Sequence, residues 1–237
     1  MDERRPSSVV GGRYIARTDL TKTELSYIKD LLDDFGCTTD TPELVLNTIS
    51  KRYEALDRIV DVLPYPTDTA TWLGYAKGIH NFLFSGLMTF AVTFRSATDR
   101  GGGRVYFGGQ HNRERKHKFE GISTHRINAD LVEAFDCLVK AANPAQDAIY
   151  FYWRWSFIHP FYDANGRIAR ILIMLFLFHH GKEINWITLD RSHSKFMKKL
   201  NDCHKVAHEK KILNELLVYL YNFWLPHISS YDPIGNY

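Results

Sequence analysis

HPFYDANGRIARILIMLFLF, residues 159–178, is the stretch that decides the fold of this 237-residue chain. Its first part, 159–170, brings together a histidine, a carboxylate, an amide, a glycine and two arginines. Every residue of its second part, 171–178, is apolar, which is typical of a helix buried on all sides. The sequence therefore predicts a polar loop at the start of a core helix.

The first polar residues of this loop suit proton transfer and metal binding beside a phosphate. Pro160 disfavours helical dihedral angles for the residue before it, so His159 is expected on a loop. There its imidazole can accept a proton from a hydroxyl group near neutral pH. Asp163 is a hard oxygen ligand, suited to Mg²⁺ that is held together with phosphate oxygens. We interpret the loop as a site that holds a nucleotide polyphosphate and activates a hydroxyl against it.

The turn before the helix is predicted to bind an anion. Ala164, Asn165 and Gly166 are small or turn-prone, and a tight turn here exposes consecutive N–H groups at a helix start. Arg167 and Arg170 can project on one side of that helix. Arginine in the first turn opposes the helix dipole by ~0.3–1 kcal/mol, a cost that a bound anion would offset. Each feature alone is common on solvated surfaces, so the interpretation rests on their combination.

Composition favours a globular protein with a substantial core. Hydrophobic residues make up 45% and charged residues 24%, which argues against disorder. The net charge of +3, from 30 basic and 27 acidic residues, is too small to predict a nucleic acid partner. The longest apolar run, 171–178, is far shorter than the roughly 20 residues that span a bilayer, so we expect no membrane partner.

The cysteines and the N-terminus favour a cytoplasmic protein. Cys37, Cys137 and Cys203 are widely spaced and form no CxxC pair, as expected in a reducing compartment, and we interpret them as structural. The first ten residues, MDERRPSSVV, include no apolar stretch long enough for a signal peptide. The oligomeric state is left open, a homo-oligomer included.

Helix-start and helix-stop residues divide the chain into helices. Thr41-Pro42 and Asn143-Pro144 each combine a capping side chain with proline at the first helical position, and Gly36 ends a periodic stretch. The predicted helices run from about residue 22 to 35, 42 to 60, 69 to 90, 124 to 141, 144 to 158, 166 to 180 and 192 to 210, with a last one ending near Trp224.

The pattern changes between the third and fourth helices. Residues 98–109 carry five glycines and a short β-like run, Arg104, Val105, Tyr106 and Phe107. A basic loop, 110–121, follows. We interpret 104–122 as a small hairpin, called the flap below, so the predicted fold class is all-α with one small β-hairpin.

The stretch 159–170 resembles the motif of the Fic family, His-x-Phe-x-Asp/Glu-Gly-Asn-Gly-Arg-x-x-Arg, and departs from it at Ala164, where the motif has glycine. Further segments resemble Fic domains: IHNFLF (79–84), FAVTFR (90–95), the flap, and RSHSKFMKKLNDC (191–203). The resemblance covers about residues 70–220. It predicts a Fic-type helical bundle as a core domain over 69–225, after an N-terminal helical region (1–68) with a regulatory role and before a tail (226–237).

The resemblance implies a protein adenylyltransferase, which moves AMP from ATP to a Ser, Thr or Tyr hydroxyl of a target protein. His159 would be the general base and Asp163 would bind Mg²⁺. The phosphates would be bound by Asn165, Gly166, Arg167 and Arg170, the last holding the terminal phosphate. The flap, with Arg104, Val105, Tyr106 and Phe107, would receive the target as an added strand.

Other activities stay open. The related Doc proteins are kinases that share alanine at position 164 but have lysine in place of Gly166 and lack the final arginine. Gly166, Arg167 and Arg170 therefore favour adenylyl transfer over a Doc-like kinase. A transferase of another nucleotide-derived group and a non-catalytic nucleotide-binding module are the remaining alternatives, and the intact His159 argues against the second.

Many Fic proteins are inhibited by a glutamate in a Ser/Thr-x-x-x-Glu-Gly/Asn motif, which pairs with the second motif arginine. SKRYEA (50–55) and TDTPEL (39–44) have the Ser/Thr-to-Glu spacing, although neither has Gly or Asn next. We hypothesise that Glu54, rather than Glu43, pairs with Arg170 and blocks productive ATP binding.

Two further features receive ordinary structural interpretations. His204 and His208 have a metal-compatible spacing, but no third ligand is evident and the segment is rich in lysine, so we interpret them as a surface pair. The basic run RERKHK (113–118) is interpreted as a solvated loop tip that, on the flap, could help to select the target.

Overall fold

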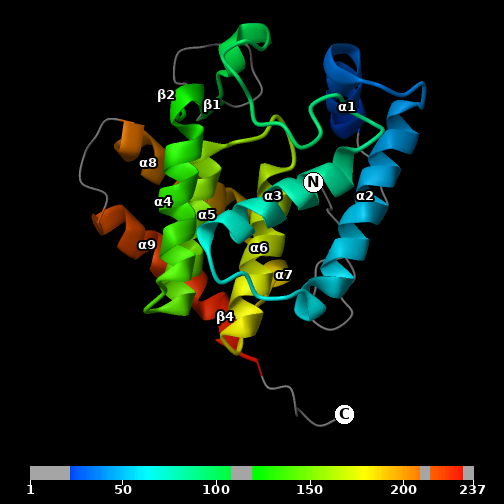
Figure 1. Cartoon of the computed structure of the whole chain (residues 1–237). Helices are drawn as coiled ribbons and strands as arrows, with labels where there is room; N and C mark the ends of the chain where they lie inside the picture. Colours follow the sequence, from blue (N-terminus) through cyan, green and yellow to red (C-terminus); the bar gives the residue numbers. More distant parts are fainter. Residues whose placement is uncertain (1–21, 108–118, 209–213, 232–237) are drawn as a thin grey trace.

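The computed structural model describes residues 22–107, 119–208 and 214–231. This part of the chain is a helical bundle with two small antiparallel sheets (Figure 1), so the predicted fold class is confirmed. The helices are α1 (Lys22–Phe35), α2 (Pro42–Ile59), α3 (Thr69–Phe84), α4 (Ile127–Val139), α5 (Pro144–Ile158), α6 (Asn165–His179), α7 (Trp186–Arg191), α8 (His193–His208) and α9 (Asn214–Trp224). The strands are β1 (Tyr106–Phe107), β2 (Phe119–Glu120), β3 (Lys182–Ile184) and β4 (Ile228–Ser230).

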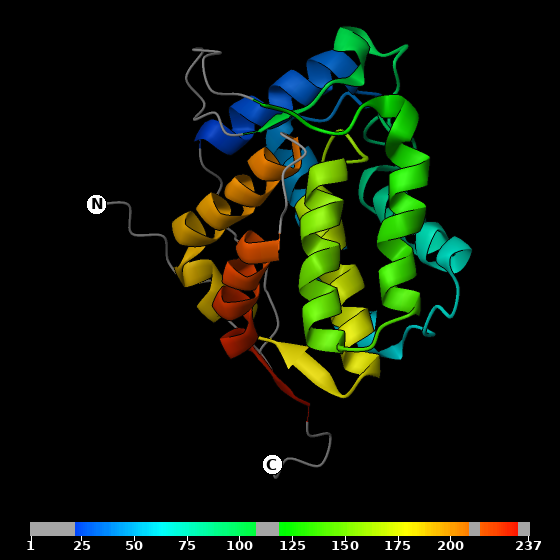
Figure 2. The ribbon, with the colours of Figure 1, turned by 90° about the vertical axis from the view of Figure 1, so that its left-hand side faces the viewer.

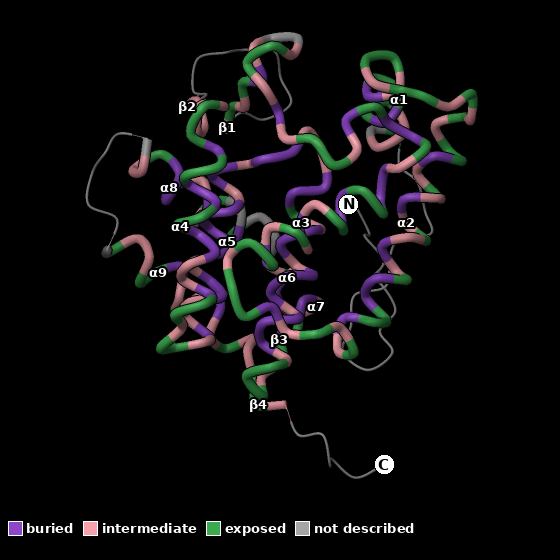
Figure 3. The backbone as a smooth tube through the Cα atoms, in the orientation of Figure 1, coloured by how far each residue is buried: buried purple, intermediate pink, exposed green. Residues whose placement is uncertain are grey.

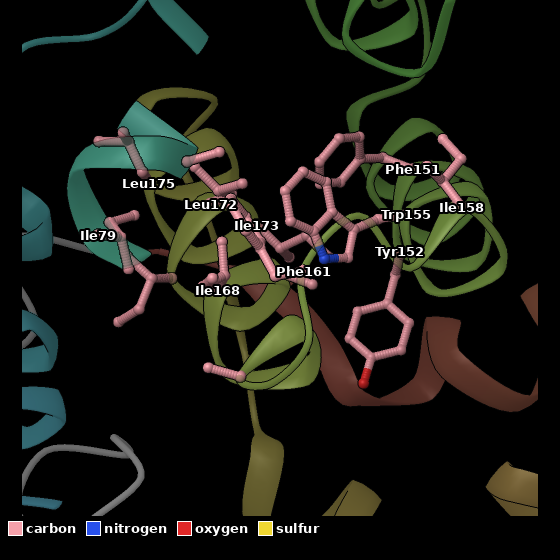
Figure 4. Close-up of a cluster of buried hydrophobic side chains, with 14 of the residues drawn as sticks. Ile79, Phe151, Tyr152, Trp155, Ile158, Phe161, Ile168, Leu172, Ile173 and Leu175 are labelled. Carbon is pink, nitrogen blue, oxygen red and sulfur yellow. The ribbon is translucent and has the colours of Figure 1, made fainter. Parts of the chain in front are cut away.

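The apolar run 171–178 lies in the central helix α6, as predicted. Most of its side chains are fully buried, and the buried positions continue along α5 (Figure 3). Ile79 of α3, Trp155 of α5, and Ile168 and Leu172 of α6 belong to one cluster of buried side chains (Figure 4). Because each fully buried side chain of this kind contributes ~1.5–3 kcal/mol, α6 and its neighbours form a rigid support for whatever lies at its start.

The capping residues predicted for the helix starts are used. Thr41 accepts a hydrogen bond from the N–H of Leu44 at the start of α2. Asn143 accepts one from the N–H of Gln146 at the start of α5. The start of α6 differs, because its cap residue Ala164 has no side-chain acceptor to offer.

Helix α3 ends at Phe84, earlier than the predicted residue 90. The chain turns at Gly86, which has a φ of +75°, and then runs beside the end of α1. The N–H of Thr89 donates to the carbonyl of Phe35, and the N–H of Cys37 donates to that of Leu87. These backbone bonds replace those that a longer α3 would have made.

The region expected to be a C-terminal tail from residue 226 is in part a strand. β4 pairs with β3, with Ile184 opposite Ile228 and Lys182 opposite Ser230. Neither strand was predicted, nor was the short helix α7, because three-residue strands and a six-residue helix are too short to show a periodic pattern.

The flap is present as β1 and β2, with Tyr106 opposite Glu120 and Phe107 opposite Phe119. The basic run 113–118 lies outside the described residues. The flap, helix α1 and the loop between α5 and α6 all lie at one end of the bundle (Figure 2). Within the described ranges, no helix has the length and apolar character needed to cross a membrane.

Candidate active site

His159 is positioned as a neutral proton acceptor in the loop between α5 and α6. It ends α5 in the left-handed conformation, with a φ of +49°, and its N–H donates to the carbonyl of Trp155 at 2.8 Å. A backbone hydrogen bond with Ser156 acts to raise its pKa, and a neutral imidazole has one ring nitrogen that can accept a proton. Desolvation, assisted by the positive charge of Arg95, lowers the pKa of His159 to about 4, against the opposing effect of Asp163.

Arg95 fixes this loop to the base of the flap. Arg95 is 2% exposed, and its guanidinium donates to four backbone carbonyls. Two belong to the end of α5, at Ile158 (2.8 Å) and His159 (2.7 Å). The other two belong to the flanks of the flap, at Gly103 (2.6 Å) and Ile122. One buried cation therefore sets how the flap lies relative to His159.

The loop is closed by Asn165. Its side-chain amide donates to the carbonyl of Phe161 at 2.8 Å, and its side-chain oxygen accepts from the N–H of Phe161 at 3.1 Å. The indole of Trp155 donates to the carbonyl of Asn165 at 2.9 Å. The side chain of Asn165 is thus committed to the loop, and what it can offer a phosphate is its backbone N–H.

His80 supports Phe161 in this loop, and Ala164 has an unusual backbone conformation there. His80 stacks on the ring of Phe161, with centroids 3.9 Å apart, and its Nδ1 accepts from the N–H of Val92 at 2.9 Å. Ala164 has a φ of +61°. This conformation costs a residue with a Cβ about 1–2 kcal/mol, which explains why glycine suits the position and why alanine needs the closed loop to hold it.

The start of α6 has the form of an anion site. The first N–H groups of a helix have no acceptor within the helix, and here the first to find one is that of Ile168, which donates to Ala164 at 2.9 Å. At Gly166 only the Tyr152 hydroxyl lies within 4 Å of where a Cβ would stand, at 3.9 Å. A phosphate could therefore approach the N–H groups at positions 165–167 closely.

Asp163 stands beside this helix start and could hold a metal ion. Arg167 donates to it at 2.8 Å. Within the described part of the chain no cluster of three His, Cys, Asp or Glu side chains suits a metal. Mg²⁺ is commonly held by one or two carboxylates with waters and phosphate oxygens, so a single carboxylate next to an anion site fits Mg²⁺ that arrives with phosphates.

Arg170 is paired with Asp190, a partner that the sequence analysis did not predict. It donates to both carboxylate oxygens of Asp190, at 2.8 and 2.6 Å, and lies over the ring of Trp186. The hypothesised partner Glu54 instead forms an ion pair with Arg58 at 3.8 Å. The expected Glu54–Arg170 pair is therefore not formed in this structure, because α7 brings Asp190 to the arginine.

The flap brings an aromatic side chain to His159. Phe107 lies with its ring centroid 5.8 Å from that of His159, whereas Tyr106 and Arg104 are exposed, Arg104 pairing with Glu120 at 3.6 Å. Val105 accepts a backbone hydrogen bond from Gly121 at 3.0 Å. Of the predicted flap residues, Phe107 is the one in contact with the histidine.

The interpretation of His204 as a surface residue is wrong. It is 1% exposed, and its ring lies 4.6 Å from that of Phe107 and 5.3 Å from that of Phe157. Burial lowers its pKa to about 3, so it is neutral. Helical spacing from the buried residues Phe196 and Leu200 could have placed His204 on the inner face of α8.

The fold is a helical domain in which the motif loop joins the core helices α5 and α6. Residues 73–177 match the family model Fic/DOC family. The structure is similar to a Fic family protein from Desulfovibrio desulfuricans G20, with a TM-score of 0.50, 18% identity, and coverage of 88% of this chain but 58% of that one. The segment 73–177 is therefore a domain of the Fic/DOC family.

Two similar structures contain nucleotides. The N-terminal Fic domain of a putative cell filamentation protein from Bartonella quintana, with bound ADP, has a TM-score of 0.57 and 14% identity, covering 84% of this chain and 91% of that one. BepC from Bartonella tribocorum, with bound AMPPNP, has a TM-score of 0.52 and 13% identity, covering 82% and 90%. No curated protein matches the chain.

We predict that Arg95→Met lowers the free energy of unfolding by at least about 3 kcal/mol. The substitution leaves four carbonyls without their donor, and each buried group left unsatisfied costs about 1–3 kcal/mol. Urea denaturation measures the change, with Arg104→Met, an exposed arginine, as the control. Equal stability of the two variants would show that Arg95 does not hold the loop and flap together.

Proposed function

We propose that the protein is an adenylyltransferase that moves AMP from ATP to a Ser, Thr or Tyr hydroxyl of a target protein, using Mg²⁺. The observation that carries the proposal is the position of His159, which lies between the first turn of α6 and Phe107 of the flap. Members of the Fic family transfer nucleotide-derived groups to proteins. The ADP and AMPPNP bound in the two Bartonella structures support the proposal that this protein binds a nucleotide.

The nucleotide phosphates are proposed to bind at the first turn of α6. The N–H groups at positions 165–167 and the guanidinium of Arg167 supply hydrogen bonds and positive charge. Arg170 would bind the terminal phosphate, and its two hydrogen bonds to Asp190 would be replaced by hydrogen bonds to that phosphate. Asp163 would hold Mg²⁺, which when bound would neutralise charge on the phosphate oxygens.

The transfer itself needs one base at the acceptor hydroxyl. The free ring nitrogen of His159 takes the proton as the hydroxyl oxygen attacks the α-phosphorus. The bond from that phosphorus to the β-phosphate oxygen breaks, so pyrophosphate leaves and the target keeps AMP. Because the histidine is neutral well below pH 7, it is ready to accept the proton throughout the physiological range.

The acceptor is proposed to arrive on the flap. An extended target segment can add to the exposed edge of a hairpin through backbone hydrogen bonds. Arg95 fixes the flanks of the hairpin at Gly103 and Ile122 relative to the carbonyl of His159. A strand added to the flap would thus be held at a defined distance from the base, whatever its sequence.

We predict that the protein transfers label from α-labelled ATP to protein in the presence of Mg²⁺, with its own hydroxyls or those of a cell lysate as acceptors. His159→Ala should reduce the rate by ~10²–10⁴-fold, because it removes the base. His125→Ala, which changes an exposed histidine, should leave the rate unchanged. Label transferred only from γ-labelled ATP would identify a kinase instead. ATP binding without any transfer would identify a binding module.

We predict that protonation of His159 does not reduce kcat/KM for the transfer between pH 7.5 and pH 5.5. Protonation inactivates the base, and with a pKa of about 4 in the folded protein this loss begins only below that range. An unperturbed histidine would lose activity near pH 6.5. The pH profile of kcat/KM is measured at saturating Mg²⁺ for the wild-type protein and for variants in which the other histidines are replaced. A loss of activity near pH 6.5 that persists in all of these variants would contradict the assigned environment of His159.

A further inference from the structure

The extended run that begins the flap presents its side chains alternately to two sides. Arg104 and Tyr106 are exposed. Val105 and Phe107, which alternate with them, are half-buried, as expected for a strand. The ring of Phe107 lies 5.8 Å from that of His159, measured between centroids. The inner face of the flap is therefore the face that carries Phe107, and it is turned toward the proposed base.

The ring of Phe107 fills the space between the flap and the end of α5. It packs against His204 of α8, with centroids 4.6 Å apart, and against Phe157 of α5 at 6.1 Å. It also covers Gly121, where an added Cβ would stand 2.7 Å from a ring carbon of Phe107. These contacts hold the ring in place. The backbone of β1 thus stands one phenylalanine side chain away from His159.

The flap cannot move closer to the base without breaking buried hydrogen bonds. Arg95 donates to the carbonyls of Gly103 and Ile122 on the two flanks of the flap. It also donates to the carbonyl of His159 at 2.7 Å. A target strand added to β1 would therefore lie at a fixed distance from His159, and that distance is the one that the side chain of Phe107 spans.

The three hydroxyl groups that could accept AMP differ in their distance from the backbone. A serine or threonine hydroxyl is bonded directly to Cβ, whereas a tyrosine hydroxyl stands at the far end of an aromatic ring. Residues opposite each other on paired strands share a face and have Cβ atoms about 4.5–5.5 Å apart. The target residue opposite Phe107 would thus start beside the Cβ of Phe107, and it needs a side chain of at least that length to reach His159.

We propose that the acceptor is a tyrosine, because serine and threonine hydroxyls on a strand added to the flap do not reach His159. The inference rests on the proposed function and narrows its acceptor to one residue type. The phenol oxygen forms the bond to the α-phosphorus, its proton passes to a ring nitrogen of His159, and the bond to the departing pyrophosphate breaks. The tyrosine ring would lie beside Phe107 as a cross-strand aromatic pair, which is a stabilising arrangement.

The test is to map the modified residues by peptide mass spectrometry after incubating the full chain with ATP, Mg²⁺ and a cell lysate. AMP should be found on tyrosine. Serine is among the commonest residues in proteins, so an acceptor site without preference would label it often. AMP mainly on serine or threonine would overturn the inference and leave the proposed function intact. No AMP on any protein would contradict the proposed function, and the inference with it.

Peptides copied from a mapped tyrosine site give a direct comparison. The same peptide with serine or threonine in place of the tyrosine should accept AMP ~10²–10⁴-fold more slowly, because its hydroxyl lies out of reach of the general base. Similar rates for the three peptides would show that the length of the side chain does not select the acceptor.

Phe107→Ala tests the contact between the acceptor and the flap. Loss of the ring should lower kcat/KM for the tyrosine peptide roughly fivefold and leave the KM for ATP unchanged. Phe82→Ala, which removes a ring that is 44% exposed on α3, is the matched control and should change neither value. An unchanged kcat/KM in Phe107→Ala, or an equal loss with Phe82→Ala, would show that the acceptor does not pass beside Phe107.

Discussion

The buried guanidinium of Arg95 is the constraint on which the site depends. A charge inside a protein is tolerated only where hydrogen bonds replace its hydration, and here the replacement is four backbone carbonyls from three separate segments. These carbonyls come from the end of α5 and from both flanks of the flap. The hydrogen bonds of this one side chain therefore hold His159, the flap and the loop together. The same cation helps to keep the imidazole of His159 neutral, so it links the architecture of the site to its chemistry.

The loop between α5 and α6 has two residues in unfavourable backbone conformations, and neighbouring side chains stabilise it. His159 and Ala164 both adopt left-handed conformations, which are unfavourable for residues with a Cβ. The side chain of Asn165 is hydrogen-bonded to the backbone of Phe161, and the ring of His80 stacks on the Phe161 side chain. The buried helix α6 begins at this loop, and its first N–H groups find no acceptor within the helix. In the proposed arrangement, a phosphate would bind there once Arg167 and Arg170 leave the carboxylates with which they are paired in this structure.

The parts that could be predicted from the sequence are those with local causes. The apolar run after the motif predicted the core helix α6, and capping residues such as Asn143 predicted where helices begin. The residues gathered around the loop were identified by type, but their partners were not. Asn165 closes the loop with its side chain, Arg170 is paired with Asp190, and His204 lies beneath the flap. Each of these contacts depends on how distant segments pack. Helical spacing could have placed His204 on the inner face of α8, but it does not indicate that the flap lies against that face.

The most direct measurement is a crystal structure of the protein with AMPPNP and Mg²⁺. The phosphates should lie against the N–H groups of the first turn of α6, with the metal at Asp163 and with Arg170 turned from Asp190 to the terminal phosphate. The α-phosphate should stand within reach of the free ring nitrogen of His159. A nucleotide bound elsewhere, or one bound at the loop while Arg170 keeps both bonds to Asp190, would contradict the proposed arrangement of the site.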